Sequence, residues 1–159
     1  MDAVKGLLKL IAALIILGAI TALPAFAGEY TETDVKIRFV RNTTNGIKKG
    51  FELKGKTLSS EKLRAADKLG LAAANKVVEL VKAANLFDEY AAQLFDPEIQ
   101  ALDVKALEAD SIEEVSQILE QQLQYTKEHY PRLYAWLESS EELKLVMLKM
   151  FFEMCNELN

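Results

Sequence analysis

The feature that most constrains the fold is a helical spacing of apolar residues along residues 59–159. From Leu63 onward, apolar side chains recur at steps of three and four residues, which places them on one face of an α-helix. The final segment carries two neighbouring apolar stripes, and a helix of this kind needs cover on several sides. We therefore expect residues 59–159 to form an irregular bundle of four to five helices. The last helix would lie at its centre, and the alternative is that part of its surface meets another molecule.

Serines and prolines mark the expected ends of these helices. A serine can accept a hydrogen bond from the first helical turn, and a proline interrupts or starts a helix. The signals are the Ser59-Ser60 pair, Asp96-Pro97, the capping-box spacing Ser111-x-x-Glu114, Pro131, and a second box, Ser139-x-x-Glu142. We expect the second box to open the last helix.

Residues 28–58 show a period of two instead. The alternation consists of the apolar Val35, Ile37 and Phe39 separated by the basic Lys36 and Arg38. It resumes after the turn-forming sequence at residues 42–46, which predicts a basic β-hairpin with Phe39 paired with Phe51. The predicted fold class is mainly α (α+β): a short hairpin packed on the helical bundle, with residues 28–159 forming one domain.

Residues 1–27 have the pattern of an export signal. Two lysines precede the uncharged run Leu10–Leu23, and small residues end the segment at Ala27. We expect cleavage after Ala27 and a periplasmic or secreted product. The alternative is an uncleaved membrane anchor with an N-terminal helix, because residues 7–27 approach the ~20 residues that span a bilayer.

Charge is divided unevenly along the chain, whose net charge is −5. Residues 28–82 hold 12 basic and 7 acidic residues, whereas residues 83–159 hold 5 basic and 16 acidic residues. Such asymmetry can steer a charged partner onto one face, or the two halves can neutralise each other in the fold. The overall acidity, without aromatic residues interleaved among the basic ones, argues against nucleic acid as a partner.

Two groups of residues are candidates for partner binding. They are the outer face of the predicted hairpin, with Lys36, Arg38, Lys48 and Lys54, and an aromatic group near Pro131, with Tyr130, Tyr134 and Trp136. The basic face suits an anionic component of the cell envelope or an acidic protein, although lysines also protect edge strands against aggregation. Aromatic residues with polar tips suit binding surfaces, and they also fill gaps between helices.

The composition argues against most catalytic and metal sites. One histidine and one cysteine exclude multi-histidine and cysteine-rich metal motifs, and no glycine-rich phosphate loop is present. Met147, Met150 and Met154 lie near Cys155 at helical spacing, where soft copper ligands are conceivable and ordinary core packing is the simpler interpretation. We expect no catalytic residue, metal or cofactor, and a homodimer linked through Cys155 stays open.

These patterns predict a small exported protein that acts by non-enzymatic binding. Its role would resemble that of an adaptor or inhibitor in the cell envelope, with an unidentified protein or an anionic envelope component as partner. Two alternatives are a carrier that holds an apolar ligand or lipid between the last helix and the hairpin, and a membrane-anchored protein. An enzyme with a carboxylate-based site is a third class, without a recognisable spacing of acid and base.

Overall fold

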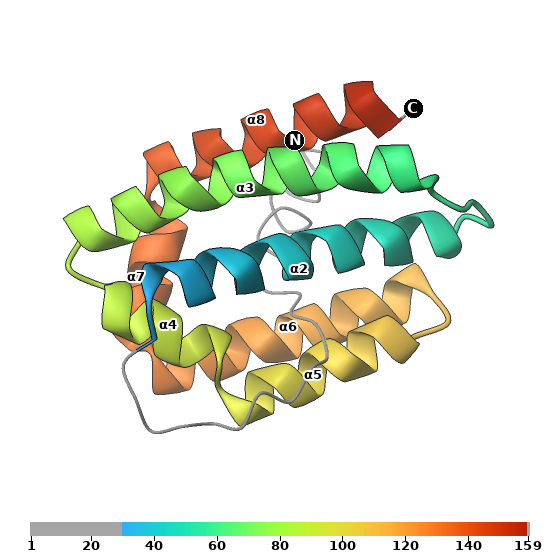
Figure 1. Cartoon of the computed structure of the whole chain (residues 1–159). Helices are drawn as coiled ribbons and strands as arrows, with labels where there is room; N and C mark the ends of the chain where they lie inside the picture. Colours follow the sequence, from blue (N-terminus) through green and yellow to red (C-terminus); the bar gives the residue numbers. More distant parts are fainter. Residues whose placement is uncertain (1–29, 159) are drawn as a thin grey trace.

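The computed structural model describes residues 30–158, and this part of the chain is built of helices joined by short turns (Figure 1). The helices are α2 (Glu32–Glu52), α3 (Ser60–Ala83), α4 (Phe87–Leu94), α5 (Pro97–Glu108), α6 (Ile112–His129), α7 (Pro131–Ser139) and α8 (Glu141–Leu158). The described residues contain no strand, so the predicted β-hairpin and the α+β component are wrong. Seven helices take the place of the expected hairpin and four to five helices, and six of them lie in residues 59–158. The predicted export signal lies outside the described residues.

Helix α2 occupies the segment where we expected the hairpin. Its start is fixed by a capping box: the Thr31 hydroxyl accepts a hydrogen bond from the Asp34 amide at 3.1 Å, and the Asp34 carboxylate accepts one from the Thr31 amide at 2.8 Å. This pairing satisfies two amides that the first turn of a helix otherwise leaves without partners. The Thr31-x-x-Asp34 spacing was the sequence signal that the period-two interpretation passed over.

The composition of the buried face of α2 explains why the period-two pattern wrongly predicted a strand. Its members recur at helical steps, and they are Val35, Arg38, Phe39, Asn42, Thr43 and Gly46. Half of this stripe is polar, so a search for apolar residues alone finds the strand-like alternation instead. Ile37, which the hairpin would have buried beside Phe39, is 47% exposed. The turn-forming residues 42–46 lie within the helix because tertiary burial overrides local propensity.

Helices α2, α3 and α8 lie side by side, with α3 in the middle (Figure 1). The α2-facing part of α3 includes Gly70, at which an added Cβ would lie 3.8 Å from Val40. An ion pair between Lys82 and Glu32 joins the end of α3 to the start of α2. At the other end of α3, the Lys62 ammonium donates to the Leu158 carbonyl at 2.7 Å. Both α2 and α8 are therefore antiparallel to α3.

The core is gathered mainly around α3. Its buried apolar side chains come from both neighbours of α3 and from the short helices α4 and α7, and they include Phe39, Val77, Val81, Tyr90, Leu94, Leu133, Leu143 and Met147. A second, smaller cluster lies within the α5–α6 pair and consists of Ala106, Ala109, Ile118 and Leu119. Since α8 exposes Leu145 by 65% and Phe152 by 58%, the last helix lies at the edge of the bundle rather than at its centre.

Most of the helix boundary signals are confirmed. The Ser59 hydroxyl accepts from the Lys62 amide at 3.2 Å, and the Ser111 hydroxyl accepts from the Glu114 amide at 3.1 Å. Pro131 is the first residue of α7, as the sequence predicted. Asp96-Pro97 ends α4 as expected, but Pro97 also begins α5, which the sequence did not predict.

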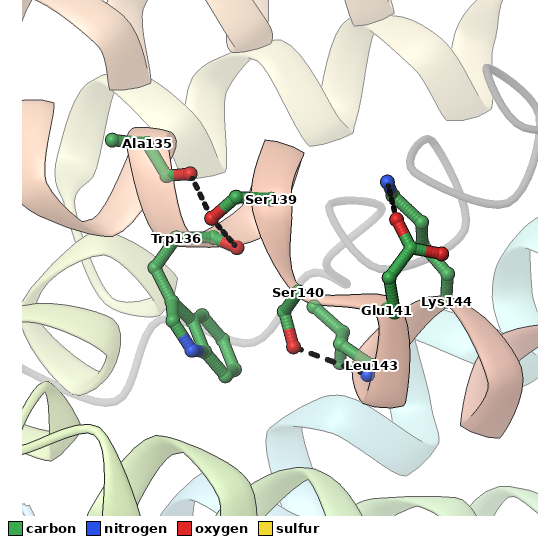
Figure 2. A network of polar contacts seen from close by, with 7 residues as sticks. All are labelled: Ala135, Trp136, Ser139, Ser140, Glu141, Leu143 and Lys144. Carbon is green, nitrogen blue, oxygen red and sulfur yellow. Dashed lines mark hydrogen bonds and ion pairs between the residues drawn. The ribbon is translucent and has the colours of Figure 1, made fainter.

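The start of α8 differs from the prediction by one residue. As Figure 2 shows, Ser139 closes α7, and its hydroxyl donates back to the Ala135 carbonyl at 2.8 Å. The cap of α8 is Ser140, whose hydroxyl accepts from the Leu143 amide at 3.2 Å. The adjacent serines thus divide two tasks, one ending a helix and the other beginning the next. Within residues 30–158, no helix combines the length and the apolarity needed to cross a membrane.

We predict that Thr31→Ala lowers the free energy of unfolding by about 1 kcal/mol, because the mutant loses the cap of α2. Thr33→Ala, which changes an exposed residue in the same turn, is the matched control and should have an effect within about 0.5 kcal/mol. Urea denaturation followed by far-ultraviolet circular dichroism measures both. Equal stability of the two variants would contradict the capping box.

Candidate functional site

The structure does not assemble the four predicted basic residues into one face. Lys36 lies in the first half of α2, with its ammonium 3.9 Å from the Glu32 carboxylate. Arg38 is only 6% exposed. Lys48 and Lys54 lie near the end of α2 and are exposed. The basic face therefore divides into a paired lysine, a buried arginine and two solvent-facing lysines, of which only the last two are available to a partner.

Arg38 packs against Phe95, at the junction between α4 and α5. Its guanidinium carbon lies 4.8 Å from the centroid of the Phe95 ring, a distance suited to a cation–π interaction. The same ring stacks on Tyr30, with the centroids 4.1 Å apart. Burial lowers the pKa of Arg38, and the negative charge of Asp103 opposes that effect. The residue thus helps to hold the start of α2 against the α4–α5 junction.

A layer of buried polar residues lies within the helices that pack near Arg38. The Gln122 amide donates to the Asp103 carboxylate at 2.5 Å, which joins α6 to α5. The Gln93 amide donates to the Thr126 hydroxyl at 3.3 Å, which joins α4 to α6. All four of these side chains are at most 3% exposed. The Gln122 side-chain oxygen is buried without a hydrogen-bond partner. Hydrogen bonds between buried polar groups favour one particular helix arrangement, and we interpret this layer as structural.

The predicted aromatic residues also have partners within the chain. The Tyr130 hydroxyl donates to the Asp96 carboxylate at 2.6 Å, and the Tyr134 hydroxyl donates to Glu138 at 2.5 Å. Burial raises the pKa of Tyr130, and the hydrogen bond to Asp96 raises it further. Trp136 is half-buried against the main core. These contacts place Tyr130 at the junction between α6–α7 and α4–α5, where it joins two parts of the fold.

The surface that does gather charge surrounds the turn between α2 and α3. Residues 41–68 contain eight basic and three acidic residues. We call the following group the basic turn: Lys48, Lys49, Lys54, Lys56, Arg64 and Lys68. All except the half-buried Lys49 are exposed, and none forms an ion pair with another residue of the described range. One of the three acids, Asp67, accepts a hydrogen bond from the Thr44 hydroxyl at 2.6 Å.

Four members of the basic turn were absent from the predicted site. Lys49 would face the other side of the predicted hairpin, Lys56 was not included in it, and Arg64 and Lys68 belong to the helix that follows. The signal that could have found them is the excess of basic residues between positions 41 and 68, taken without any assumption about strand register. Because we assumed a hairpin, we grouped Lys48 and Lys54 with Lys36 and Arg38 instead of with these four residues.

An open groove of opposite charge runs along α5 and α6. Its volume is about 720 Å³, and its lining consists of Glu98, Leu102, Gln117, Glu120, Gln121, Gln124, Tyr125 and Glu128. Within residues 30–158, no group of three or more histidine, cysteine, aspartate or glutamate side chains is arranged to hold a metal ion. The described surface thus offers two regions of opposite charge, and the basic one contains two of the residues predicted for binding.

We predict that Tyr130→Phe lowers the free energy of unfolding by about 1–2 kcal/mol, because Asp96 loses a hydrogen bond to its charged carboxylate. Tyr134→Phe removes the same atom four residues away, where the partner Glu138 is exposed and on the same helix. We expect that control to change stability by less than about 0.5 kcal/mol. Thermal and urea unfolding measure the difference, and a larger loss in Tyr134→Phe would contradict the proposed role of Tyr130.

Comparisons with known proteins yield no assignment. The chain matches no protein family, no curated protein and no solved structure at a significant level. The function is therefore argued from the geometry and charges of the described residues.

Proposed function

We propose that the protein binds an anionic partner without catalysis, and that the basic turn is the contact surface. The observation that carries this proposal is a group of six basic side chains without ion-pair partners in the described range, on a chain whose net charge is −5. An acidic protein that concentrates positive charge at one turn presents that turn to an approaching anion. The remainder of its surface repels the same anion, which orients the encounter.

The chemistry of the basic turn favours an extended anionic surface over a single small anion. Five of its six members are lysines, which act as flexible point charges, whereas bidentate recognition of one phosphate or carboxylate favours arginine. The side chains come from the end of α2, the connecting turn and the first half of α3. A surface with many weakly held negative charges fits this arrangement. With the predicted export signal, the partner would be an anionic component of the cell envelope.

The buried and paired residues narrow the proposal further. Arg38 and Tyr130 are used inside the fold, so we leave them out of the contact surface. The carrier alternative needed a hairpin facing the last helix, and α3 lies between α2 and α8 instead (Figure 1). The non-enzymatic binding role thus rests on Lys48 and Lys54 together with their neighbours in the basic turn.

We predict that the triple variant Lys48→Glu, Lys54→Glu, Lys56→Glu binds vesicles of phosphatidylglycerol and phosphatidylcholine at least ten-fold more weakly than the unchanged protein at low salt. Each lysine near an anionic membrane contributes about 1 kcal/mol, and the reversal adds repulsion. Co-sedimentation measures the binding, and pure phosphatidylcholine vesicles report any charge-independent part. A polyglutamate column run in parallel shows whether an acidic polypeptide is preferred.

The matched control is Lys105→Glu, Lys127→Glu, Lys149→Glu, which changes the net charge equally at exposed positions on α5, α6 and α8. We expect the control to retain most of the binding. Equal losses in the two triple variants would show that net charge alone governs retention. Failure of the unchanged protein to bind either anionic support at low salt would reject the basic turn as a contact surface.

A further inference from the structure

The outer side of the α2–α3 pair carries exposed apolar side chains next to the basic turn. Ile37 on α2 is 47% exposed, and Leu71 on α3 is 48% exposed. Helical spacing places each of them on a stripe that runs along its helix. The two stripes are Ile37, Thr44 and Lys48 on α2, and Arg64, Asp67 and Leu71 on α3. Each stripe therefore joins an apolar residue to a member of the basic turn.

A hydrogen bond on the surface joins the two stripes. The Thr44 hydroxyl donates to the Asp67 carboxylate at 2.6 Å, so both stripes run along the same side of the helix pair. Since α2 and α3 are antiparallel, Lys48 and Arg64 both lie between this bond and the connecting turn (Figure 1). The two stripes therefore end together in basic residues.

Apolar side chains lie on the other side of the same bond. A Cβ added at Gly70 would be 3.8 Å from Val40, which is half-buried and one turn from Ile37. Leu71 follows Gly70 directly, so the three apolar side chains lie within about one helical turn of one another along the helix axes. A single exposed apolar residue is ordinary, whereas a group of them beside polar residues marks an interaction site.

This side of the molecule thus has a basic part and an apolar part. We call it the α2–α3 face, and its residues are Ile37, Val40, Lys48, Arg64, Lys68 and Leu71. We propose that the α2–α3 face lies on a bilayer that contains anionic lipids, with Ile37 and Leu71 below the phosphates and the basic side chains at the phosphates. The inference rests on the proposed function, and it names the partner of the basic turn.

A bilayer offers both chemistries that the face requires. Anionic headgroups attract lysine and arginine side chains, and hydrocarbon lies directly beneath the headgroups. The stem of a lysine is apolar, so it can lie along the interface while its ammonium reaches a phosphate. The affinity of such a surface for a bilayer combines the apolar area removed from water with the attraction between charges.

Other occupants use only part of the face. An acidic polypeptide bound through its carboxylates alone would leave Ile37 and Leu71 in water. The same face of a second copy would bring like charges together, and like charges opposite each other weaken an interface. A bilayer with anionic lipids is the occupant that covers both parts at once.

The acidic residues near the face leave its positive charge in excess. Asp67 is engaged by Thr44, and Glu52 and Glu61 are exposed at the end of α2 and in the first turn of α3. These three acids stand against the six members of the basic turn. The net attraction therefore draws this side toward an anionic surface.

Substitution of the apolar residues separates a bilayer from an acidic polypeptide. In the full chain, Ile37→Gln with Leu71→Gln should bind vesicles of phosphatidylglycerol and phosphatidylcholine about five-fold more weakly, because less apolar area leaves the water. Retention on a polyglutamate column should stay unchanged, since the basic side chains are intact. The matched control, Leu145→Gln with Phe152→Gln, replaces two exposed apolar residues of α8 and should bind the vesicles as the unchanged protein does.

A fluorescent label at position 71 measures the depth of the face. Cys155→Ala removes the sole cysteine of the sequence, and Leu71→Cys then carries a nitrobenzoxadiazole label. On the mixed vesicles its emission should shift to shorter wavelength, and nitroxide-labelled lipids should quench it. Glu113→Cys, at an exposed site on α6, is the matched position and should show neither change. The label reports on this face whichever other residues contact the vesicle.

The outcomes distinguish this inference from the proposed function. A label at position 71 that stays in water on bound protein, or a Gln pair that binds vesicles normally, would overturn the inference and leave the basic turn as a purely electrostatic contact. Retention on polyglutamate without vesicle binding would assign an acidic polypeptide instead. An equal loss in the α8 control, or equal binding to pure phosphatidylcholine, would also overturn the inference. Binding to neither anionic support would reject the basic turn and the inference together.

Discussion

The fold depends on α3 being narrow enough to have a neighbour on each side. Ala66, Ala73 and Ala74 are at most 5% exposed, and Gly70 lies against Val40 of α2. Small side chains allow neighbouring helices to approach closely, so that larger residues such as Phe39 and Met147 complete the core from outside α3. Helices α2 and α8 therefore lie on the two sides of α3.

Neighbouring helices cover α2 and α8 to different extents. Helix α2 lies between α3 and the α5–α6 pair, and it meets that second neighbour in a region rich in polar groups, near Arg38 and Asn42. Helix α8 has the described bundle on one side only, which leaves Leu145 and Phe152 on its outer surface. The most polar of the long helices thus has a neighbouring helix on either side, and the most apolar is at the edge. Hydrophobicity averaged along a helix does not determine its place in a bundle.

Basic and acidic side chains are concentrated on different helices. The α2–α3 turn gathers lysines, while α5 and α6 carry the acidic groove. The exposed charges thus stay apart on the described surface, while the buried Arg38 and Asp103 attract each other where the two halves meet. Coulomb attraction between exposed charges is weak for any single pair, but a group of like charges orients a partner over about 10 Å at 0.1 M salt. A binding role through one end of the bundle is consistent with that distribution.

Sequence patterns predicted those features that arise within one helical turn. Ser59, Ser111 and Pro131 begin helices as expected, because a cap or a proline acts on amides three or four residues away and needs no distant partner. The Thr31-x-x-Asp34 box belongs to the same class, and it would have identified α2 had it been weighed against the alternation. Asp96-Pro97 was expected to mark the end of a helix, and in the structure it also begins α5.

By itself the sequence determined the helical character of residues 59–158, most of the boundaries and the unequal charge of the two halves. Only the tertiary structure decided that residues 32–52 are helical and that Arg38 is buried and Ile37 exposed. The physical reason is that burial depends on which surfaces meet. A polar side chain such as Asn42 can be buried once a neighbouring helix covers it, and no local pattern records that neighbour.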